Sequence, residues 1–212
     1  MASKSCTASL PIGAVNMLDD LAVARSELIL GGQKSGKSRR AELLALAWLA
    51  QSPAHSAVLI ATAQPWDDEM RERIERHQAD RAKRVPSLRV VEEPVQLAVA
   101  LGKLSQLHTL VVVDCLTLWL TNLLMPAPNN EPNMRSAQGT QALIAMLLGV
   151  IDRAPGPIAL VGNEIGLGVI PMGRDTRAFV DALGGLNQAV AQMCQRVTFM
   201  AAGLPMILKD QP

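Results

Sequence analysis

The sequence predicts an α/β fold in which a mostly parallel β-sheet carries helices on both faces. Short apolar runs alternate with longer helix-forming stretches along the chain, which is typical of βαβ units. Several runs, such as residues 110–114, are unbroken and rich in β-branched side chains, as in strands covered on both faces. A glycine-rich turn after the first run matches G-x-x-x-x-G-K-S and leads into a helix. The expected fold is therefore that of a P-loop NTPase of the RecA-like type.

The elements follow one another with short connections. Strands are expected at residues 27–30, 58–61, 88–91, 110–114, 158–161, 197–201 and 206–208. Helices are expected at residues 37–50, 65–84, 95–104, 137–151 and 174–195. The second helix opens with Pro65 and a run of acidic residues, which suit a helix N-terminus. Gly184 and Gly185 predict an interruption of the last helix, and the proline-rich residues 125–132 predict a loop.

The 212 residues suffice for one domain with a large core. Residues 27–212 hold the expected strands and helices and form the predicted P-loop domain. Residues 1–26 lack a clear periodicity and are expected to be an N-terminal extension, either a mobile arm or one that packs on a neighbour.

Composition and charge exclude several classes of protein. Lys and Arg number 20 against 19 Asp and Glu, so the net charge is +1, and aromatic residues make up only 2%. A nucleic-acid binder needs a basic surface or aromatic stacking platforms, and neither is present. The apolar runs are too short to span a bilayer. The scattered Cys6, Cys115 and Cys194 form no CxxC pair, so we expect reduced thiols and a cytoplasmic protein.

The glycine-rich turn is the strongest functional signal in the chain. Its glycines allow backbone N–H groups to point inward at phosphate oxygens, at the positive end of the following helix. In this pattern the lysine, Lys37, reaches the β- and γ-phosphates and the hydroxyl of Ser38 holds Mg²⁺. The alternative is a glycine-rich turn with a surface lysine. The predicted phosphate-binding residues are Gly31, Gly32, Gln33, Lys34, Ser35, Gly36, Lys37 and Ser38.

Two further strand ends carry polar residues. Asp114 ends a buried strand, where it would bind Mg²⁺ directly or through water, and an N-cap is the alternative. Asn163 and Glu164 end the next apolar strand and precede Gly166 and Gly168. Ligands of open α/β sheets bind beyond the carboxyl ends of the strands, so these residues are candidates for the site. A solvated loop is the alternative interpretation.

A histidine lies between two arginines on the charged second helix. Arg73, His77 and Arg81 are spaced four residues apart, so their side chains can point the same way. Two cations favour a neutral imidazole, which is a nucleophile, and the arginines could hold a polyphosphate for it to attack. On the residues alone, a solvated helix with an uninvolved histidine is the simpler interpretation.

Taken in order, several motifs resemble those of one known family. They are the turn at residues 31–38, residues 60–62, 67–70 and 73–77, Glu92 with Pro94, and residues 114–124, 163–168 and 177–188. The set is similar to the bifunctional adenosylcobinamide kinase / adenosylcobinamide-phosphate guanylyltransferase family of cobalamin biosynthesis. The resemblance covers about residues 27–209 and gives the N-terminal extension no role.

The resemblance implies two reactions. ATP or GTP phosphorylates the aminopropanol hydroxyl of adenosylcobinamide. GTP then guanylylates a histidine with loss of pyrophosphate, and GMP passes to the phosphorylated corrinoid to give adenosyl-GDP-cobinamide. The family's histidine falls on His77. A homo-oligomer, with a trimer as one form, is also implied.

The resemblance further implies which residues contact the nucleotide. Beyond the glycine-rich turn, they are Ala61, Thr62, Ala63, Gln78, Ala79, Asp80, Arg81, Glu92 and Asp114. Two other functions stay open. A single-activity P-loop kinase of another small alcohol would leave His77 idle. A nucleotide-driven switch would need a partner surface, and no large exposed patch can be recognised in the sequence.

Overall fold

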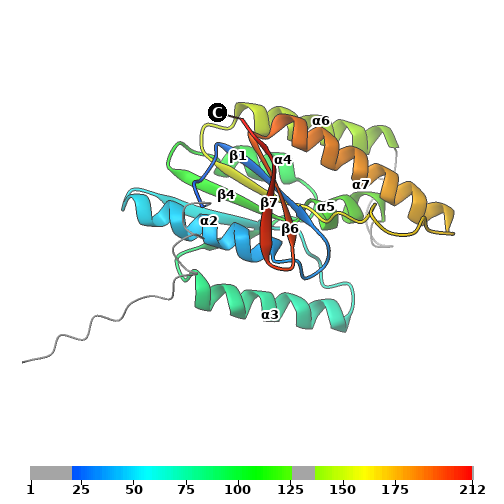
Figure 1. Ribbon diagram of the computed structural model, residues 1–212, viewed down its shortest axis with the longest axis horizontal. Helices are drawn as coiled ribbons and strands as arrows, with labels where there is room; N and C mark the ends of the chain where they lie inside the picture. The colour runs from blue at the N-terminus through cyan, green and yellow to red at the C-terminus, as the bar shows by residue number, and fades with distance from the viewer. Residues whose placement is uncertain (1–20, 126–136, 212) are drawn as a thin grey trace, which may run out of the picture.

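The computed structural model describes residues 21–125 and 137–211, which form a single seven-stranded sheet with helices on both faces (Figure 1). The strand order is β3-β2-β4-β5-β1-β6-β7, and only β7 runs antiparallel to its neighbour. The strands are β1 (Ser26–Gly31), β2 (Ser56–Ala61), β3 (Arg89–Glu92), β4 (Thr109–Asp114), β5 (Ile158–Val161), β6 (Arg196–Ala201) and β7 (Leu204–Asp210). The predicted fold class is confirmed.

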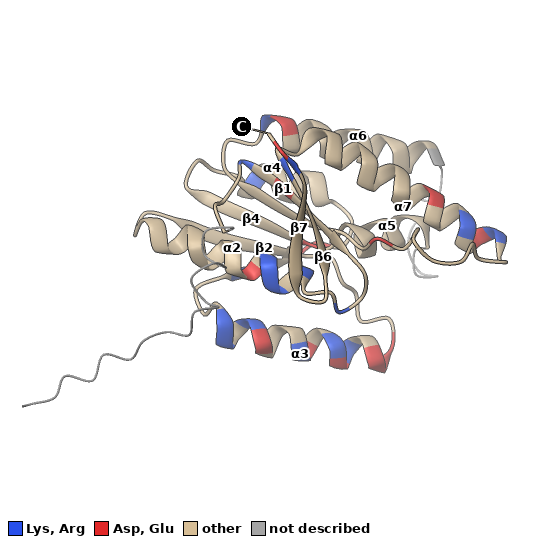
Figure 2. Cartoon of the chain, in the orientation of Figure 1, with Lys and Arg blue, Asp and Glu red and all other residues tan. Residues whose placement is uncertain are grey.

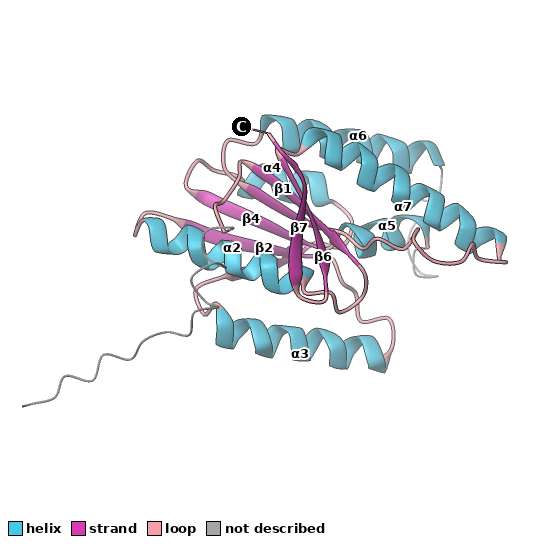
Figure 3. Cartoon of the chain, viewed as in Figure 1, coloured by secondary structure: helices cyan, strands magenta, loops and turns pink. Residues whose placement is uncertain are grey.

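The helices form two layers around the sheet, as Figure 3 shows. They are α2 (Lys37–Gln51), α3 (Asp68–Arg84), α4 (Leu97–Leu104), α5 (Leu116–Leu124), α6 (Ala137–Arg153) and α7 (Arg174–Met193). One apolar cluster joins α2 to its face of the sheet, and a larger one joins α4, α5, α6 and α7 to the other face. Helix α3 lies outside α2 and alternates acidic and basic residues along its length (Figure 2). Its polar composition matches a helix that contributes little to the core.

The central strands are buried on both faces, which explains their unbroken apolar sequences. Residues 109–113 of β4 and all four residues of β5 are buried. Trp119 of α5 is fully buried beneath them, and its Nε1 donates a hydrogen bond to the carbonyl of Val95 at 2.9 Å. The indole thus fills the core without leaving a buried donor unpaired.

Three helices differ from the sequence predictions. Helix α3 begins at Asp68 with Asp67 as its N-cap, so the predicted start at Pro65 is wrong. Helix α7 continues through Gly184 and Gly185, so the predicted interruption is wrong. The flanking Leu183 and Leu186 are buried in the core, and this packing offsets the roughly 1 kcal/mol that each glycine costs a helix. Helix α5 was not predicted, because its run of nine residues is short and mostly buried. The predicted loop at 125–132 lies outside the described residues from 126 onward.

The residues just before β1 contact the domain. Leu21 is buried in the α2-side cluster, and the carbonyl of Ala22 accepts a hydrogen bond from Arg196 at 2.6 Å. The backbone N–H of Arg25 donates to the side chain of Gln195 at 2.8 Å. Residues 1–20 lie outside the described part of the chain, so the division into an extension and a P-loop domain stays a prediction. Over the described residues, no helix combines the length and apolarity needed to cross a membrane.

Candidate functional site

The glycine-rich turn between β1 and α2 adopts a backbone that requires glycine at two positions. Gly31 has φ +152° and Gly36 has φ +102°, both in the region that side chains disfavour. A Cβ on Gly31 would lie 2.4 Å from the carbonyl oxygen of Met200 and 2.7 Å from Oγ of Ser35. The turn therefore packs closely against β6, and its backbone curls so that Ser35 lies close to Gly31.

The hairpin between β6 and β7 packs against this turn. The N–H of Gly203 donates to the carbonyl of Ser35 at 3.0 Å, and its Cα would lie 3.2 Å from a Cβ on Gly36. Ala202 and Gly203 both have positive φ, as a tight two-residue hairpin requires. No local signal in the sequence predicts this contact, because residues 202 and 203 are far from the turn along the chain.

We expect Gly31→Ala to destabilise the protein strongly. The new methyl group has no space, and the backbone must leave its native conformation, which costs on the order of 2–4 kcal/mol. For a chain of this size the Tm should fall by about 5 °C or more in a thermal melt. Gly32→Ala is the matched control, because a Cβ there meets no atom within 4 Å. Equal melting temperatures for the two variants would contradict this account.

Lys37 begins α2 and points back into the turn. Its side chain is buried, and Nζ donates to the carbonyl of Gly32 at 2.6 Å and lies 3.5 Å from Oγ of Ser35. Burial lowers the pKa of Lys37, and Arg73 lowers it further, whereas Cys115 and Asp114 raise it. The Lys37 side chain is thus held at the centre of the glycine-rich turn, within electrostatic range of Asp114 and of Arg73 on α3.

Asp114 ends β4 at the same edge of the sheet. It pairs in register with Ala61 of β2 and Val161 of β5, and β5 lies between β4 and β1. Thr62 continues from β2, and its buried hydroxyl donates to the carbonyl of Cys115 at 2.7 Å and accepts from the Cys115 N–H at 2.8 Å. These two hydrogen bonds of the Thr62 side chain therefore link the end of β2 to the end of β4.

The donor set fits a magnesium–nucleotide complex. Asp114 and Ser38 are half-buried hard-oxygen groups, and among the described residues neither side chain has a hydrogen-bond or ion-pair partner. No group of three or more His, Cys, Asp or Glu in that part of the chain could hold a metal alone. Mg²⁺ usually keeps waters and phosphate oxygens beside one or two protein ligands, so this sparse set suits it.

We expect Asp114→Asn to raise the Mg²⁺ concentration needed for half-maximal activity, without unfolding the protein. The substitution keeps the shape of the side chain and removes its charge, which weakens the attraction for a divalent cation. Metal titrations of activity, with a thermal melt as the folding control, measure this. An unchanged Mg²⁺ requirement would contradict a role of Asp114 in binding the metal.

Helix α3 is fastened to α2 by ion pairs near its C-terminal end. Glu42 of α2 lies 3.7 Å from Arg81 and 2.8 Å from Arg84, measured between side-chain oxygen and nitrogen. His77 lies one turn before Arg81 on the same face and is half-buried. Burial lowers the pKa of His77, and the arginines of α3 add to this, whereas Asp114 raises it. The imidazole is therefore biased toward its neutral form and lies within range of Asp114.

The positive charge of Arg73 acts both on His77 and on the lysine of the glycine-rich turn. Arg73 lies one turn before His77 and is half-buried. Its positive charge lowers the pKa of both His77 and Lys37, so it is within electrostatic range of both side chains. Of the predicted common face, Arg81 pairs with Glu42 of α2, and the charge of Arg73 acts on both His77 and Lys37.

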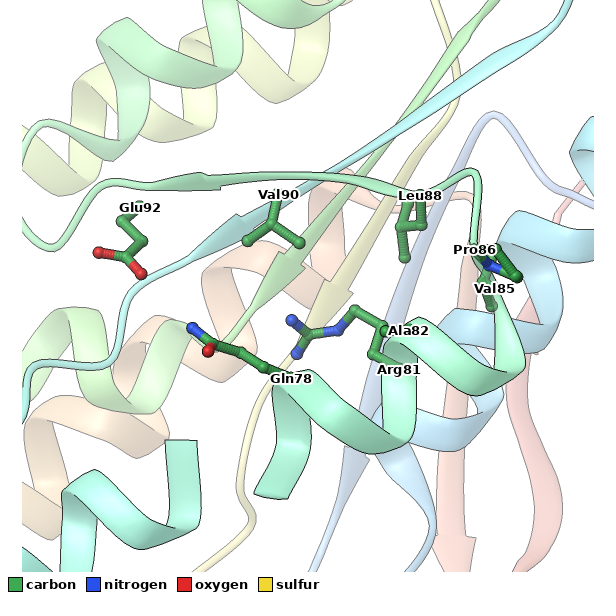
Figure 4. A pocket seen from close by; sticks show the side chains of 8 residues that line it. All are labelled: Gln78, Arg81, Ala82, Val85, Pro86, Leu88, Val90 and Glu92. Atoms are coloured by element: carbon green, nitrogen blue, oxygen red, sulfur yellow. The ribbon is translucent and has the colours of Figure 1, made fainter. Parts of the chain in front are cut away.

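Other predicted nucleotide contacts surround a cavity of about 430 Å³ between α3 and β3 (Figure 4). Gln78, Arg81 and Glu92 line it together with apolar residues such as Leu88 and Val90. The structure does not bring every predicted contact to this cavity. Ala79 and Asp80 are exposed elsewhere on α3, and Ala63 is half-buried after β2.

The residues after β5 form an exposed apolar loop beside the turn. Leu167, Val169, Ile170 and Met172 are 78%, 96%, 77% and 95% exposed. This exposed patch cannot be recognised in the sequence, because an apolar run does not by itself show whether it is covered. Glu164, at the start of this loop, donates its N–H to the carbonyl of Gly31 at 3.1 Å.

Comparison with solved structures agrees with the fold. A flagellar accessory protein, FlaH, from Methanocaldococcus jannaschii superposes with a TM-score of 0.51 at 13% identity, over 92% of this chain and 84% of its own. A protein of Pyrococcus horikoshii OT3 gives the same TM-score at 10% identity, over 92% of this chain and 91% of its own. At these identities the likeness shows the fold alone.

Comparison with characterised sequences is more specific. The bifunctional adenosylcobalamin biosynthesis protein CobP of Pseudomonas aeruginosa is 47% identical over 187 residues, which are 88% of this chain and 98% of that protein. The corresponding CobU protein of Escherichia coli is 32% identical over 86% of this chain and 98% of its own. A family model described as cobinamide kinase / cobinamide phosphate guanyltransferase matches residues 27–208. The chain therefore belongs to the cobinamide kinase / cobinamide phosphate guanyltransferase family.

Proposed function

We propose that this chain phosphorylates adenosylcobinamide on its aminopropanol hydroxyl with ATP or GTP, and then transfers GMP from GTP through His77 to give adenosyl-GDP-cobinamide. Both reactions are those of its family and belong to cobalamin biosynthesis. One observation carries the assignment to this site. The lysine of the phosphate-binding turn and His77 share an electrostatic environment, since Asp114 and Arg73 act on the pKa of both.

In the kinase step, the chain binds and orients the triphosphate. The backbone N–H groups of residues 31–38 and the Nζ of Lys37 hold the β- and γ-phosphates, aided by the N-terminus of α2. Mg²⁺, if bound through Ser38, Asp114 and phosphate oxygens, would neutralise charge on the transferring phosphoryl group. Because phosphoryl transfer depends mainly on positioning and electrostatics, this arrangement needs no covalent intermediate.

In the guanylyl step, the neutral imidazole of His77 attacks the α-phosphorus of GTP. A P–N bond forms, the bond to the β-phosphate breaks, and pyrophosphate leaves. Arg73 lies in range of both His77 and the turn, so its guanidinium can stabilise the departing charge. The cavity lined by Gln78, Arg81 and Glu92 adjoins the next turn of α3 and offers a place for the guanosine.

The same residues distinguish the proposed function from two alternatives. A single-activity kinase does not need a histidine with a lowered pKa beside its phosphate site. A nucleotide-driven switch would bind and hydrolyse nucleotide without passing a phosphoryl group to a corrinoid. Labelling of the protein therefore tests the guanylyl step, and phosphorylation of adenosylcobinamide tests the kinase step.

The deciding experiment is incubation with GTP labelled at the α-phosphate, in parallel with GTP labelled at the γ-phosphate. We expect protein-bound label only from the α-labelled nucleotide, labile in acid and stable in base, as for a phosphoramidate. Addition of unlabelled adenosylcobinamide phosphate should discharge the label into the corrinoid. Absence of α-label, with an active kinase, would favour the single-activity enzyme.

We further propose a cytoplasmic homo-oligomer, with a trimer as one form. Support comes from β7, an edge strand on which Leu204, Met206 and Leu208 are 68%, 56% and 58% exposed. Exposed apolar side chains on an edge strand are typical of surfaces that become covered in an assembly. Light scattering coupled to size-exclusion chromatography measures the oligomeric state, and a monomer at micromolar concentration would contradict the proposal.

A further inference from the structure

The chain leaves β5 through a segment that is fixed on both sides. The N–H of Glu164 donates to the carbonyl of Gly31 at 3.1 Å, and the N–H of Asn163 donates to Oγ1 of Thr117 at 2.8 Å. Strand β5 lies between β1 and β4, so this segment emerges between the phosphate-binding turn and Asp114. Glu164 is thereby held beside the first residue of the turn.

The carboxylate of Glu164 is oriented but not neutralised. Its Oε1 accepts a hydrogen bond from the N–H of Gly166 at 2.7 Å, which fixes the side chain within its own loop. Across residues 21–125 and 137–211, Oε2 has no hydrogen-bond partner, and neither oxygen forms an ion pair. Glu164 therefore has its backbone held against the first residue of the turn and carries a carboxylate oxygen that no described group neutralises, which leaves that oxygen able to accept a proton.

Of the transfers in the proposed reaction sequence, only one uses an acceptor that must lose a proton. The imidazole of His77 attacks through a lone pair, and the phosphate of the phosphorylated corrinoid is already an anion. The alcohol of the kinase step, in contrast, has a proton that must be removed as the oxygen attacks. We propose that Glu164 is the general base of the kinase step; this inference rests on the proposed function.

The step balances without any further reactant. The hydroxyl oxygen forms a bond to the γ-phosphorus, the bond from that phosphorus to the β,γ-bridging oxygen breaks, and the nucleoside diphosphate leaves with the electron pair. The hydroxyl proton passes to Oε2 of Glu164 and is released to water when the product departs.

The surroundings of Glu164 leave room for a large acceptor. Glu164 lines a groove of about 1,090 Å³ that runs along α7, slightly larger than the roughly 300–1,000 Å³ typical of small-molecule sites. Exposed Leu167 and Val169 contribute apolar surface on one side. On α7, a Cβ at Gly184 or Gly185 would meet no atom within 4 Å, so this wall is open. A macrocyclic alcohol in the groove could present its hydroxyl to Glu164.

The test is Glu164→Gln, which keeps the size of the side chain and an acceptor for the N–H of Gly166. We expect the kcat of adenosylcobinamide phosphorylation to fall about 10²- to 10⁴-fold, with the KM for ATP changed by less than about twofold. Labelling by α-labelled GTP, and discharge of the label to adenosylcobinamide phosphate, should keep the wild-type rates. The control is Glu72→Gln on α3, an exposed residue that should affect none of these steps.

Two results with a folded Glu164→Gln protein would overturn the proposal. A kinase kcat within threefold of wild type would exclude Glu164 as the base. Equal loss of both activities with a raised Mg²⁺ requirement would make Glu164 a metal ligand instead. If Glu164→Gln fails to fold, Glu164→Asp should show a reduced kinase kcat and unchanged labelling, and an unchanged kcat there would also exclude the base. A wild-type protein without kinase activity would instead refute the proposed function itself.

Discussion

Lys37→Ala should abolish the kinase step. In the proposed function the ammonium of Lys37 faces the β- and γ-phosphates, so the substitution removes that charge while keeping a residue that favours the first turn of α2. Loss of one such contact to a transferring phosphoryl group costs on the order of 10²- to 10³-fold or more in kcat. Phosphorylation of adenosylcobinamide by labelled ATP measures this. A folded Lys37→Ala protein that works at the wild-type rate would refute the role of the turn.

The fold of this variant needs its own control, because Nζ of Lys37 also donates to the carbonyl of Gly32. Lys37→Arg keeps the positive charge and a donor, yet its guanidinium is larger than the space around the buried ammonium. We expect both variants to keep the native circular dichroism spectrum and both to lose most activity. Lys103→Ala, at an exposed position of α4, should keep full activity.

The parts of the site that the sequence predicts are those fixed by local geometry. The turn at residues 31–38 is recognisable because glycine at 31 and 36 is required by the backbone itself. The arginines and the histidine of α3 could be placed on one face because helix periodicity fixes their relative directions. Asp114 could be placed at the carboxyl edge of the sheet because it is the last residue of an otherwise unbroken apolar strand.

The parts that the sequence does not predict depend on contacts between distant segments. The hairpin at residues 202–203 supports the turn through a single hydrogen bond and close packing. The ion pairs of Glu42 with Arg81 and Arg84 decide which face of α3 turns inward. Helix α5 and the uninterrupted α7 are set by burial in the core, which overrides short-range propensity.

His77→Ala should eliminate guanylyl transfer and all labelling of the protein by α-labelled GTP. The variant lacks the nitrogen that forms the P–N bond, and no positioning effect can replace it. The kinase step should survive at least in part, since direct phosphoryl transfer uses the turn and an oriented alcohol rather than a carrier. Arg73→Ala and Arg81→Ala should reduce labelling less, because these residues stabilise charge without forming the bond. Label on the His77→Ala protein would mean that another residue is the nucleophile.

The pH profile of labelling adds a second test of the same residue. Burial lowers the pKa of His77 from its ordinary value of 6.5, and Arg73, Arg81 and Arg76 act in the same direction. Only the neutral imidazole attacks, so labelling should persist into acid and fall with a midpoint below about 6.5. Asp114 opposes this shift because its negative charge favours the imidazolium. With saturating GTP and Mg²⁺, Asp114→Asn should therefore move the midpoint to still lower pH, and a movement to higher pH would contradict the assignment of the acid limb to His77.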